Sequence, residues 1–149
     1  MQYPTKLAAI SVWMVFLLFG CGEPKTENTV SLHKIKDLKT RQYAIAGREL
    51  YVQHCANCHQ KDGTGLGLVI PPLKDSDYMI NDLGRTVRII RHGLKGEIIV
   101  NGQVYNQPMP GNPILKPIEI AQITTYIYTV WGQGEILVTP DQVSDYLKP

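Results

Sequence analysis

Cys55-Ala56-Asn57-Cys58-His59 is the stretch that decides the fold of this chain. Two cysteines three positions apart lie on one side of a helical turn, where both sulfurs can bond the two vinyl groups of one porphyrin. The next residue, His59, is then held under the iron as its proximal ligand. The pattern therefore predicts one covalently bound haem c, with Cys55 and Cys58 forming the thioether links.

Two other uses of paired cysteines need features that this sequence lacks. A zinc site needs a fourth ligand, normally from a second Cys or His pair, and the only other cysteine is Cys21. A thioredoxin-like redox pair lies near a βαβ pattern, and none surrounds this segment. Haem is therefore the favoured interpretation of the motif.

Length and composition narrow the class of protein. A chain of 149 residues favours one domain, and 44% apolar with 19% charged residues is typical of a globular protein. The formal net charge of +2 is too small for the basic surface of a nucleic-acid-binding protein. We therefore expect no nucleic-acid partner.

The N-terminus has the pattern of a bacterial targeting segment. Lys6 precedes a stretch of about 13 mostly apolar residues, Leu7 to Phe19, well short of a membrane-spanning helix. Leu18-Phe19-Gly20-Cys21 resembles a lipoprotein cleavage box, although Phe19 stands where a small residue is usual. The resemblance implies cleavage of residues 1–20 as a signal peptide and a diacylglycerol on Cys21. An ordinary cleaved signal peptide and an uncleaved short anchor are the alternatives.

The remaining chain divides into three predicted parts. Residues 21–41 are polar and predict a flexible tether with a stretched reach of about 65–70 Å. The alternative is a short packed helix from Val30 to Leu38. Residues 42–133 form the predicted domain, with helices entering the haem turn, near 75–80 and 83–94, and at 118–130. Residues 97–117 are expected to be irregular, and residues 134–149 form a C-terminal tail with a plausible helix start at Thr139.

With these landmarks, residues 42–133 resemble a class I mono-haem cytochrome c. The resemblance implies an all-α fold, three to five helices wrapped around one covalently bound haem. It also implies that the first and last helices cross at a glycine–aromatic contact, here Gly47 and Tyr51 against Ile123, Tyr126 and Ile127. Pro71 and Leu73 match the proline and leucine that lie beside the proximal histidine, where the proline orients the imidazole ring.

The distal iron ligand is expected to be a methionine. Met109 lies in Pro108-Met109-Pro110, which resembles the Met-Pro ligand loop of the family, and prolines on both sides stiffen the backbone. Met79 lies in a predicted core helix, where packing is its default role. His54 is too close to the attachment turn to reach the other haem face, and His92 is expected at an exposed helix end.

Ligation by His59 and Met109 leaves no open position on iron, which favours electron transfer over catalysis. The expected protein is therefore not an enzyme but a lipid-anchored electron carrier in a periplasm or on an extracytoplasmic membrane face. Its partners would be a redox donor and acceptor, and it would act as a monomer or as part of a complex. One alternative is a haem peroxidase or gas sensor in which Met109 dissociates. Another is a dedicated subunit of a larger oxidase, reductase or dehydrogenase.

Overall fold

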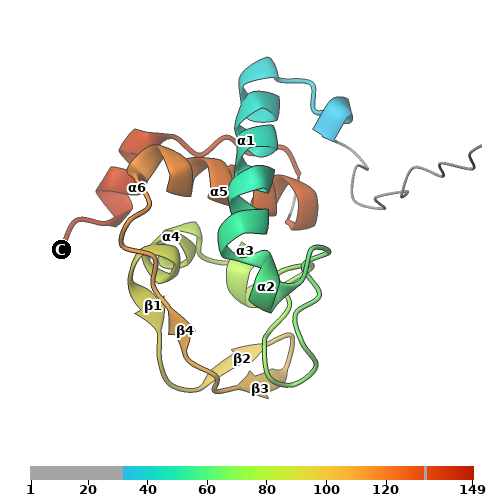
Figure 1. Ribbon diagram of the computed structural model, residues 1–149, viewed down its shortest axis with the longest axis vertical. Coiled ribbons are helices and arrows are strands. Elements are labelled where there is room, and N and C mark those ends of the chain that lie inside the picture. The colour runs from blue at the N-terminus through green and yellow to red at the C-terminus, as the bar shows by residue number, and fades with distance from the viewer. Residues whose placement is uncertain (1–31, 133) are drawn as a thin grey trace, which may run out of the picture.

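The computed structural model describes residues 32–132 and 134–149. The predicted signal peptide, Cys21 and residues 22–31 of the predicted tether lie outside the described residues. In Figure 1 the long helices lie in the upper half of the view and the short strands lie below them. In chain order the elements are η1 (Leu32–Lys34), α1 (Leu38–His54), α2 (Ala56–His59), α3 (Asp77–Ile80), α4 (Leu83–His92), β1 (Gly93–Leu94), β2 (Ile98–Val100), β3 (Gln103–Tyr105), β4 (Met109–Pro110), α5 (Pro117–Trp131) and α6 (Pro140–Tyr146).

The two longest helices, α1 and α5, pack against each other more extensively than any other pair of described elements (Figure 1). They approach so closely at Gly47 that a Cβ there would lie 2.0 Å from the carbonyl oxygen of Gln122 and 2.9 Å from Cβ of Tyr126. The structure thus confirms the predicted crossing of the first and last domain helices at Gly47.

Three buried aromatic rings join α1 to α5 beside this crossing. The ring centroid of Tyr51 lies 5.5 Å from that of Tyr126 and 5.1 Å from that of Trp131, and the latter two are 5.3 Å apart. These tilted and edge-on arrangements are the favoured geometries for aromatic pairs. The cluster fixes the end of α5 against the end of α1 that leads into Cys55.

Local sequence explains where the helices begin. Asp37 accepts a hydrogen bond of 2.7 Å from the backbone N–H of Thr40, and Asp82 accepts one of 2.8 Å from that of Arg85. Both carboxylates satisfy free N–H groups at a helix start. Pro117 occupies the first turn of α5, where its missing N–H costs nothing.

Within the described part of the chain, every helix is too short or too polar to cross a bilayer.

The part of the predicted tether that the structure describes is packed on the domain. Helix α1 begins at Leu38, four residues before the expected start of the domain at Gln42. Leu32 and Ile35 are only 4% and 3% exposed. Because these two apolar side chains stand three positions apart on one turn, they reach the core together. This arrangement is close to the alternative of a short packed helix.

Residues 97–117 contain more regular structure than expected. Strands β2 and β3 form an antiparallel hairpin, with Ile99 opposite Val104. Asn101 and Gly102 make its turn with φ of 52° and 77°, as a two-residue hairpin of the I′ type requires. The Asn-Gly pair between apolar residues was the signal that sequence reasoning passed over. Strands β1 and β4 also pair in an antiparallel manner.

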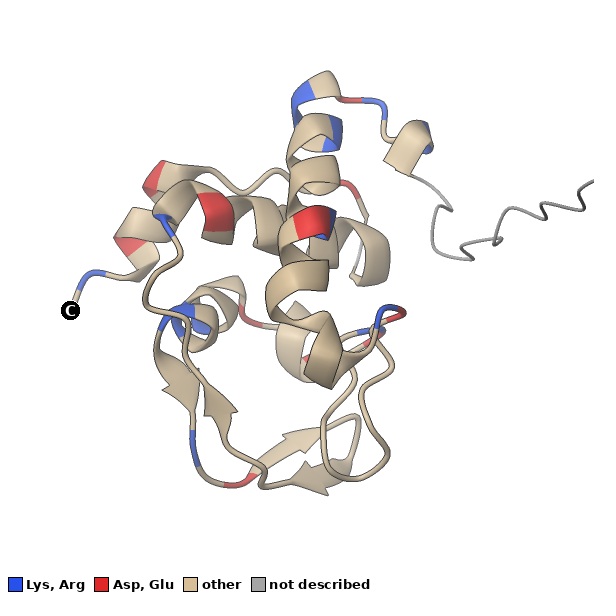
Figure 2. Ribbon diagram, viewed as in Figure 1, with Lys and Arg blue, Asp and Glu red and all other residues tan. Residues whose placement is uncertain are grey.

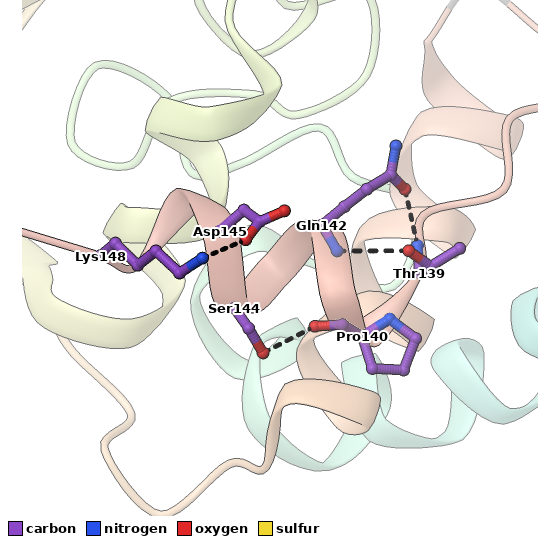
Figure 3. A network of polar contacts seen from close by, with 6 residues as sticks. All are labelled: Thr139, Pro140, Gln142, Ser144, Asp145 and Lys148. Carbon is purple, nitrogen blue, oxygen red and sulfur yellow. Dashed lines mark hydrogen bonds and ion pairs between the residues drawn. The ribbon is translucent and has the colours of Figure 1, made fainter.

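The C-terminal tail is a helix packed against α4 and α5. Figure 3 shows its start, where Thr139 and Gln142 exchange side-chain to backbone hydrogen bonds of 2.8 and 3.2 Å in a capping box. Val138 and Val143 are fully buried, and the backbone N–H of Val138 donates to Thr125 Oγ1 at 3.0 Å. The tail therefore completes the hydrophobic core.

Candidate haem-binding site

An apolar cavity lies below the α1–α5 crossing. It encloses about 650 Å³ of space not filled by atoms, part of it open to solvent. In Figure 2 the charged residues gather on helices and loops, whereas β2, β3 and β4 carry none. The lining comes from segments far apart in the sequence and includes Tyr51, Cys55, His59, Pro71, Pro72, Leu73, Met79, Ile90, Leu94, Ile98, Val100, Met109, Ile123 and Ile127.

The attachment motif occupies the end of α1 and the short helix α2. The backbone N–H groups of Cys58 and His59 both donate to the carbonyl oxygen of Cys55, at 3.1 and 3.0 Å, and so close a tight turn. Cys55 lines the cavity, whereas Cys58 is exposed and is not part of its lining. Burial raises the pKa of the Cys55 thiol to about 12, which keeps the free thiol protonated.

His59 is buried against the loop that carries Pro71. Its Nδ1 lies 3.2 Å from the carbonyl oxygen of Pro71, and since a carbonyl only accepts, Nδ1 must carry the proton. The other ring nitrogen, Nε2, therefore keeps its lone pair. Burial lowers the pKa of His59, and the hydrogen bond to Pro71 offsets part of that effect. The imidazole is thus held in the neutral form that binds metals.

The loop after His59 is folded back on itself, which brings Pro71 to the histidine. The carbonyl oxygen of His59 accepts from the N–H of Gly65 at 3.1 Å. The carbonyl oxygen of Gly63 accepts from the N–H of Leu73 at 2.8 Å and of Lys74 at 3.0 Å. These bonds clamp Pro71 and Leu73 against the cavity, where both were expected to pack.

The structure brings Met79 and Met109 to the same cavity, together with His59. Met109 lies on β4, opposite Leu94 of β1. Met79 lies on α3, is 3% exposed, and its carbonyl oxygen accepts a hydrogen bond from Tyr128 Oη. His54 and His92 do not line the cavity. Met79 is thus both a core residue and a wall residue, which the sequence pattern alone did not indicate.

Sequence reasoning missed the wall that the hairpin contributes. Ile98 and Val100 line the cavity, while Ile99 between them is 58% exposed. This alternation is the period-two pattern of a strand with one buried face.

One cation of α4 lies beside the cavity wall. Arg85 donates a hydrogen bond of 2.5 Å to the carbonyl oxygen of Tyr78, a lining residue, and its guanidinium carbon lies 3.8 Å from the centre of the Tyr78 ring. Its Nε is buried and lacks a hydrogen-bond partner among the described residues. Arg85 is therefore part of the packed structure.

These residues fit a haem. The cavity walls are almost entirely apolar, as a porphyrin ring requires, and the residues that line them include one histidine, one half-buried cysteine and two methionines. In the described residues no cluster of three or more His, Cys, Asp or Glu side chains could hold a metal ion by itself. The donor set therefore suits an iron that is carried by its own macrocycle.

Comparison with known proteins agrees with this chemistry. The family model described as Cytochrome c matches residues 44–131. The chain is 36% identical over 93 residues to cytochrome c-552 of Thermus thermophilus, which covers 60% of this chain and 70% of that protein. It is also 30% identical over 92 residues to the cytochrome c subunit of alcohol dehydrogenase (quinone) of Gluconacetobacter polyoxogenes, covering 60% of this chain and 19% of that protein.

Proposed function

The chain belongs to the cytochrome c family and binds haem c covalently, and from this premise we propose that it is a lipid-anchored carrier of single electrons. Cys55 and Cys58 would hold the porphyrin through thioether bonds, and His59 and Met109 would be the two ligands that this chain supplies to the iron. The haem supplies an iron that changes its charge by one electron. The protein is a carrier, not an enzyme.

The observation that carries this proposal is the meeting of His59, Cys55 and Met109 at one apolar cavity. An iron that keeps an imidazole and a thioether as ligands has no position left for a substrate. Since neither ligand has to leave when the charge changes, little of the structure must rearrange.

The surrounding residues keep this site in one arrangement. The carbonyl oxygen of Pro71 fixes the orientation and tautomer of His59, which makes Nε2 the nitrogen that faces a metal. The apolar walls exclude water, which favours the less charged ferrous state of the iron. Met79 also lines the cavity, and its carbonyl oxygen accepts a hydrogen bond from Tyr128 Oη.

Replacement of each methionine tests the ligand assignment. Met109→Ala should abolish the near-infrared sulfur-to-iron band of the oxidised protein and permit rapid carbon monoxide binding by the reduced protein. Met79→Leu conserves volume at the other wall methionine and should leave the band in place. A band that persists in Met109→Ala, or is lost in Met79→Leu, overturns the assignment. Rapid, stoichiometric binding of carbon monoxide by the native protein would instead support the gas-sensor or peroxidase alternative.

A second candidate function is a dedicated electron-transfer subunit of a larger redox enzyme. The similarity to a cytochrome c subunit of alcohol dehydrogenase (quinone) favours it. Detergent extraction followed by size exclusion separates the two candidates. Co-elution with a dehydrogenase, oxidase or reductase supports the subunit, and elution as a free small protein supports the diffusing carrier.

The lipid anchor is proposed from the Leu18-Phe19-Gly20-Cys21 sequence. Because Leu32 is packed on the domain, the chain between Cys21 and this residue would span at most about 40 Å rather than the reach expected for the whole tether. The domain would then work close to an extracytoplasmic membrane face. Cys21→Ala should release it into the soluble fraction, and an intact mass without a diacylglycerol on the native protein contradicts the anchor.

A further inference from the structure

The segment that carries Met109 is fastened to the C-terminal end of helix α4. Strand β4 pairs with β1, so that Gly93 lies opposite Pro110 and Leu94 lies opposite Met109. Two residues after Pro110, the backbone N–H of Asn112 donates to the carbonyl oxygen of Ile90 in α4 at 2.9 Å. The backbone at Met109 and at the residues that follow it is therefore tied to one short stretch of chain, residues 90–94.

Two residues at the end of α4 complete this attachment. Arg91 Nη1 donates a hydrogen bond of 2.6 Å to the carbonyl oxygen of Pro113. Gly93 has a φ of 82°, and a Cβ on it would lie 2.5 Å from the carbonyl oxygen of Met109 and 2.6 Å from the backbone nitrogen of Gly111. A side chain at position 93 would thus have to push the methionine segment away from α4.

Helix α4 is itself firmly held, so it can serve as a fixed support. Its residues Val87 and Ile90 are buried in the core. Thr86 Oγ1 lies 3.1 Å from Tyr128 Oη on α5, and a Cβ on Gly84 would lie 2.8 Å from the ring of Tyr146 on α6. Helices α5 and α6 therefore both restrain α4 before the chain reaches β1.

The methionine segment is rich in proline. It contains Pro108, Pro110 and Pro113, which lack backbone N–H groups and fix φ but cannot donate to a ladder. A neutral thioether also binds iron weakly compared with a thiolate. A ligand of this kind stays bound only if the protein has already restricted its alternatives.

We infer that Gly93 and Arg91 are positioning residues that hold the Met109 segment on α4 and thereby keep the sixth iron position closed. This inference rests on the proposed role of Met109 as the distal ligand. The end of α4 would then decide whether the chain behaves as an electron carrier or as an open haem that binds small ligands. Neither residue touches the iron. Both act through the backbone of the methionine segment.

A pair of glycine variants separates this role from simple backbone strain. Gly93 and Gly96 both have positive φ, but a Cβ on Gly96 would meet nothing within 4 Å. In the holoprotein, Gly93→Ala should weaken the near-infrared band and speed carbon monoxide binding by the reduced form about tenfold or more, which corresponds to a shift of about 1.4 kcal/mol. Gly96→Ala carries the same conformational strain and should retain the native band and rate.

A pair of arginine variants separates the loss of the Arg91 hydrogen bond from the loss of a positive charge. Arg91→Gln and Arg88→Gln each remove one positive charge from α4, and Arg88 is exposed one turn earlier. Both should change the reduction potential through the lost charge, but only Arg91→Gln loses the hydrogen bond to Pro113 and should bind carbon monoxide several times faster. This pair also decides the question if Gly93→Ala yields no folded holoprotein.

Urea titration distinguishes positioning from a general loss of stability. The near-infrared band and the far-ultraviolet helix signal are followed in the same samples. In Gly93→Ala and Arg91→Gln the band should disappear at lower urea while the helix midpoint moves less. If band and helix are lost together, or if both variants match their controls while Met109→Ala loses the band, the positioning inference fails and the ligand assignment stands. If Met109→Ala keeps the band, the ligand assignment fails, and this inference with it.

Discussion

Gly47 on α1 lies directly against the backbone carbonyl of Gln122 on α5, with 2.0 Å between that oxygen and the place where a Cβ would stand. Only a residue without a side chain permits this approach. The contact sets the distance between the two longest helices, and beside it the rings of Tyr51, Tyr126 and Trp131 fill the gap. Gly47 therefore determines how closely α1 and α5 pack above the haem cavity.

Gly47→Ala should destabilise the holoprotein by about 2–3 kcal/mol, because the helices must separate to admit the methyl group. The helix propensity of alanine acts in the opposite direction by about 1 kcal/mol. Urea unfolding followed by circular dichroism measures the net effect. Ala46→Gly, at the preceding position of the same helix, isolates the propensity term. A Gly47→Ala protein as stable as the native one would show that the crossing is not tightly packed.

Alkaline pH should weaken the fold through its buried tyrosines. Burial raises the pKa of Tyr51, Tyr126 and Tyr128 above the ordinary value of 10.0. Above about pH 10 the unfolded chain therefore loses protons that the folded chain retains. These three tyrosines therefore do not change the free energy of unfolding below about pH 10. Above that pH the free energy of unfolding falls by up to about 1.4 kcal/mol per pH unit for each tyrosine.

The free energy of unfolding between pH 8 and pH 11 measures this slope, and tyrosinate absorbance reports the ionisation. Tyr51→Phe should make the slope shallower, although it also removes the 2.6 Å hydrogen bond from Tyr51 Oη to the carbonyl oxygen of Gln60. If all 8 tyrosines of the chain ionise near pH 10 without unfolding, burial does not protect these three.

Tyr128→Phe should lower the free energy of unfolding by about 1–2 kcal/mol, because it leaves the buried carbonyl of Met79 without its Tyr128 donor and removes the contact with Thr86. The near-infrared band should persist, since Met79 is not the proposed ligand. Tyr43→Phe on α1 removes a tyrosine hydroxyl outside this network and is the matched control. Loss of the band in Tyr128→Phe would point to Met79 as the iron ligand.

Val143→Ala should cost about 2 kcal/mol, since Val143 is fully buried where α6 packs on the domain. Ser144→Ala, at the exposed neighbouring position in Figure 3, loses only the 2.9 Å bond to the carbonyl oxygen of Pro140 and should stay within about 0.5 kcal/mol of the native protein. Thermal or urea unfolding compares the two variants. Equal, small losses would mean that the tail is not part of the cooperative fold.

The sequence predicted best those structural features that depend on residues within one segment. The helix entering Cys55 and the helix predicted at 118–130 follow from local spacing, and the family resemblance implied the glycine of the crossing. The structure has all three at the expected places. The hairpin turn at Asn101-Gly102 was equally local and was missed. The packing of Leu32 and Ile35 could not be predicted, because the polar residues around them suggested a solvated tether. Only the folded domain shows the surface against which these two side chains are buried.

The amino-acid sequence alone determined the cofactor chemistry, because covalent attachment and proximal ligation need only five consecutive residues, Cys55 to His59. Tertiary structure alone decided that two methionines share the cavity, that the segment of Met109 is tied to the end of α4, and that the tail closes the core. The physical reason is distance along the chain. These contacts join residues more than ten positions apart, and packing of the whole domain selects them.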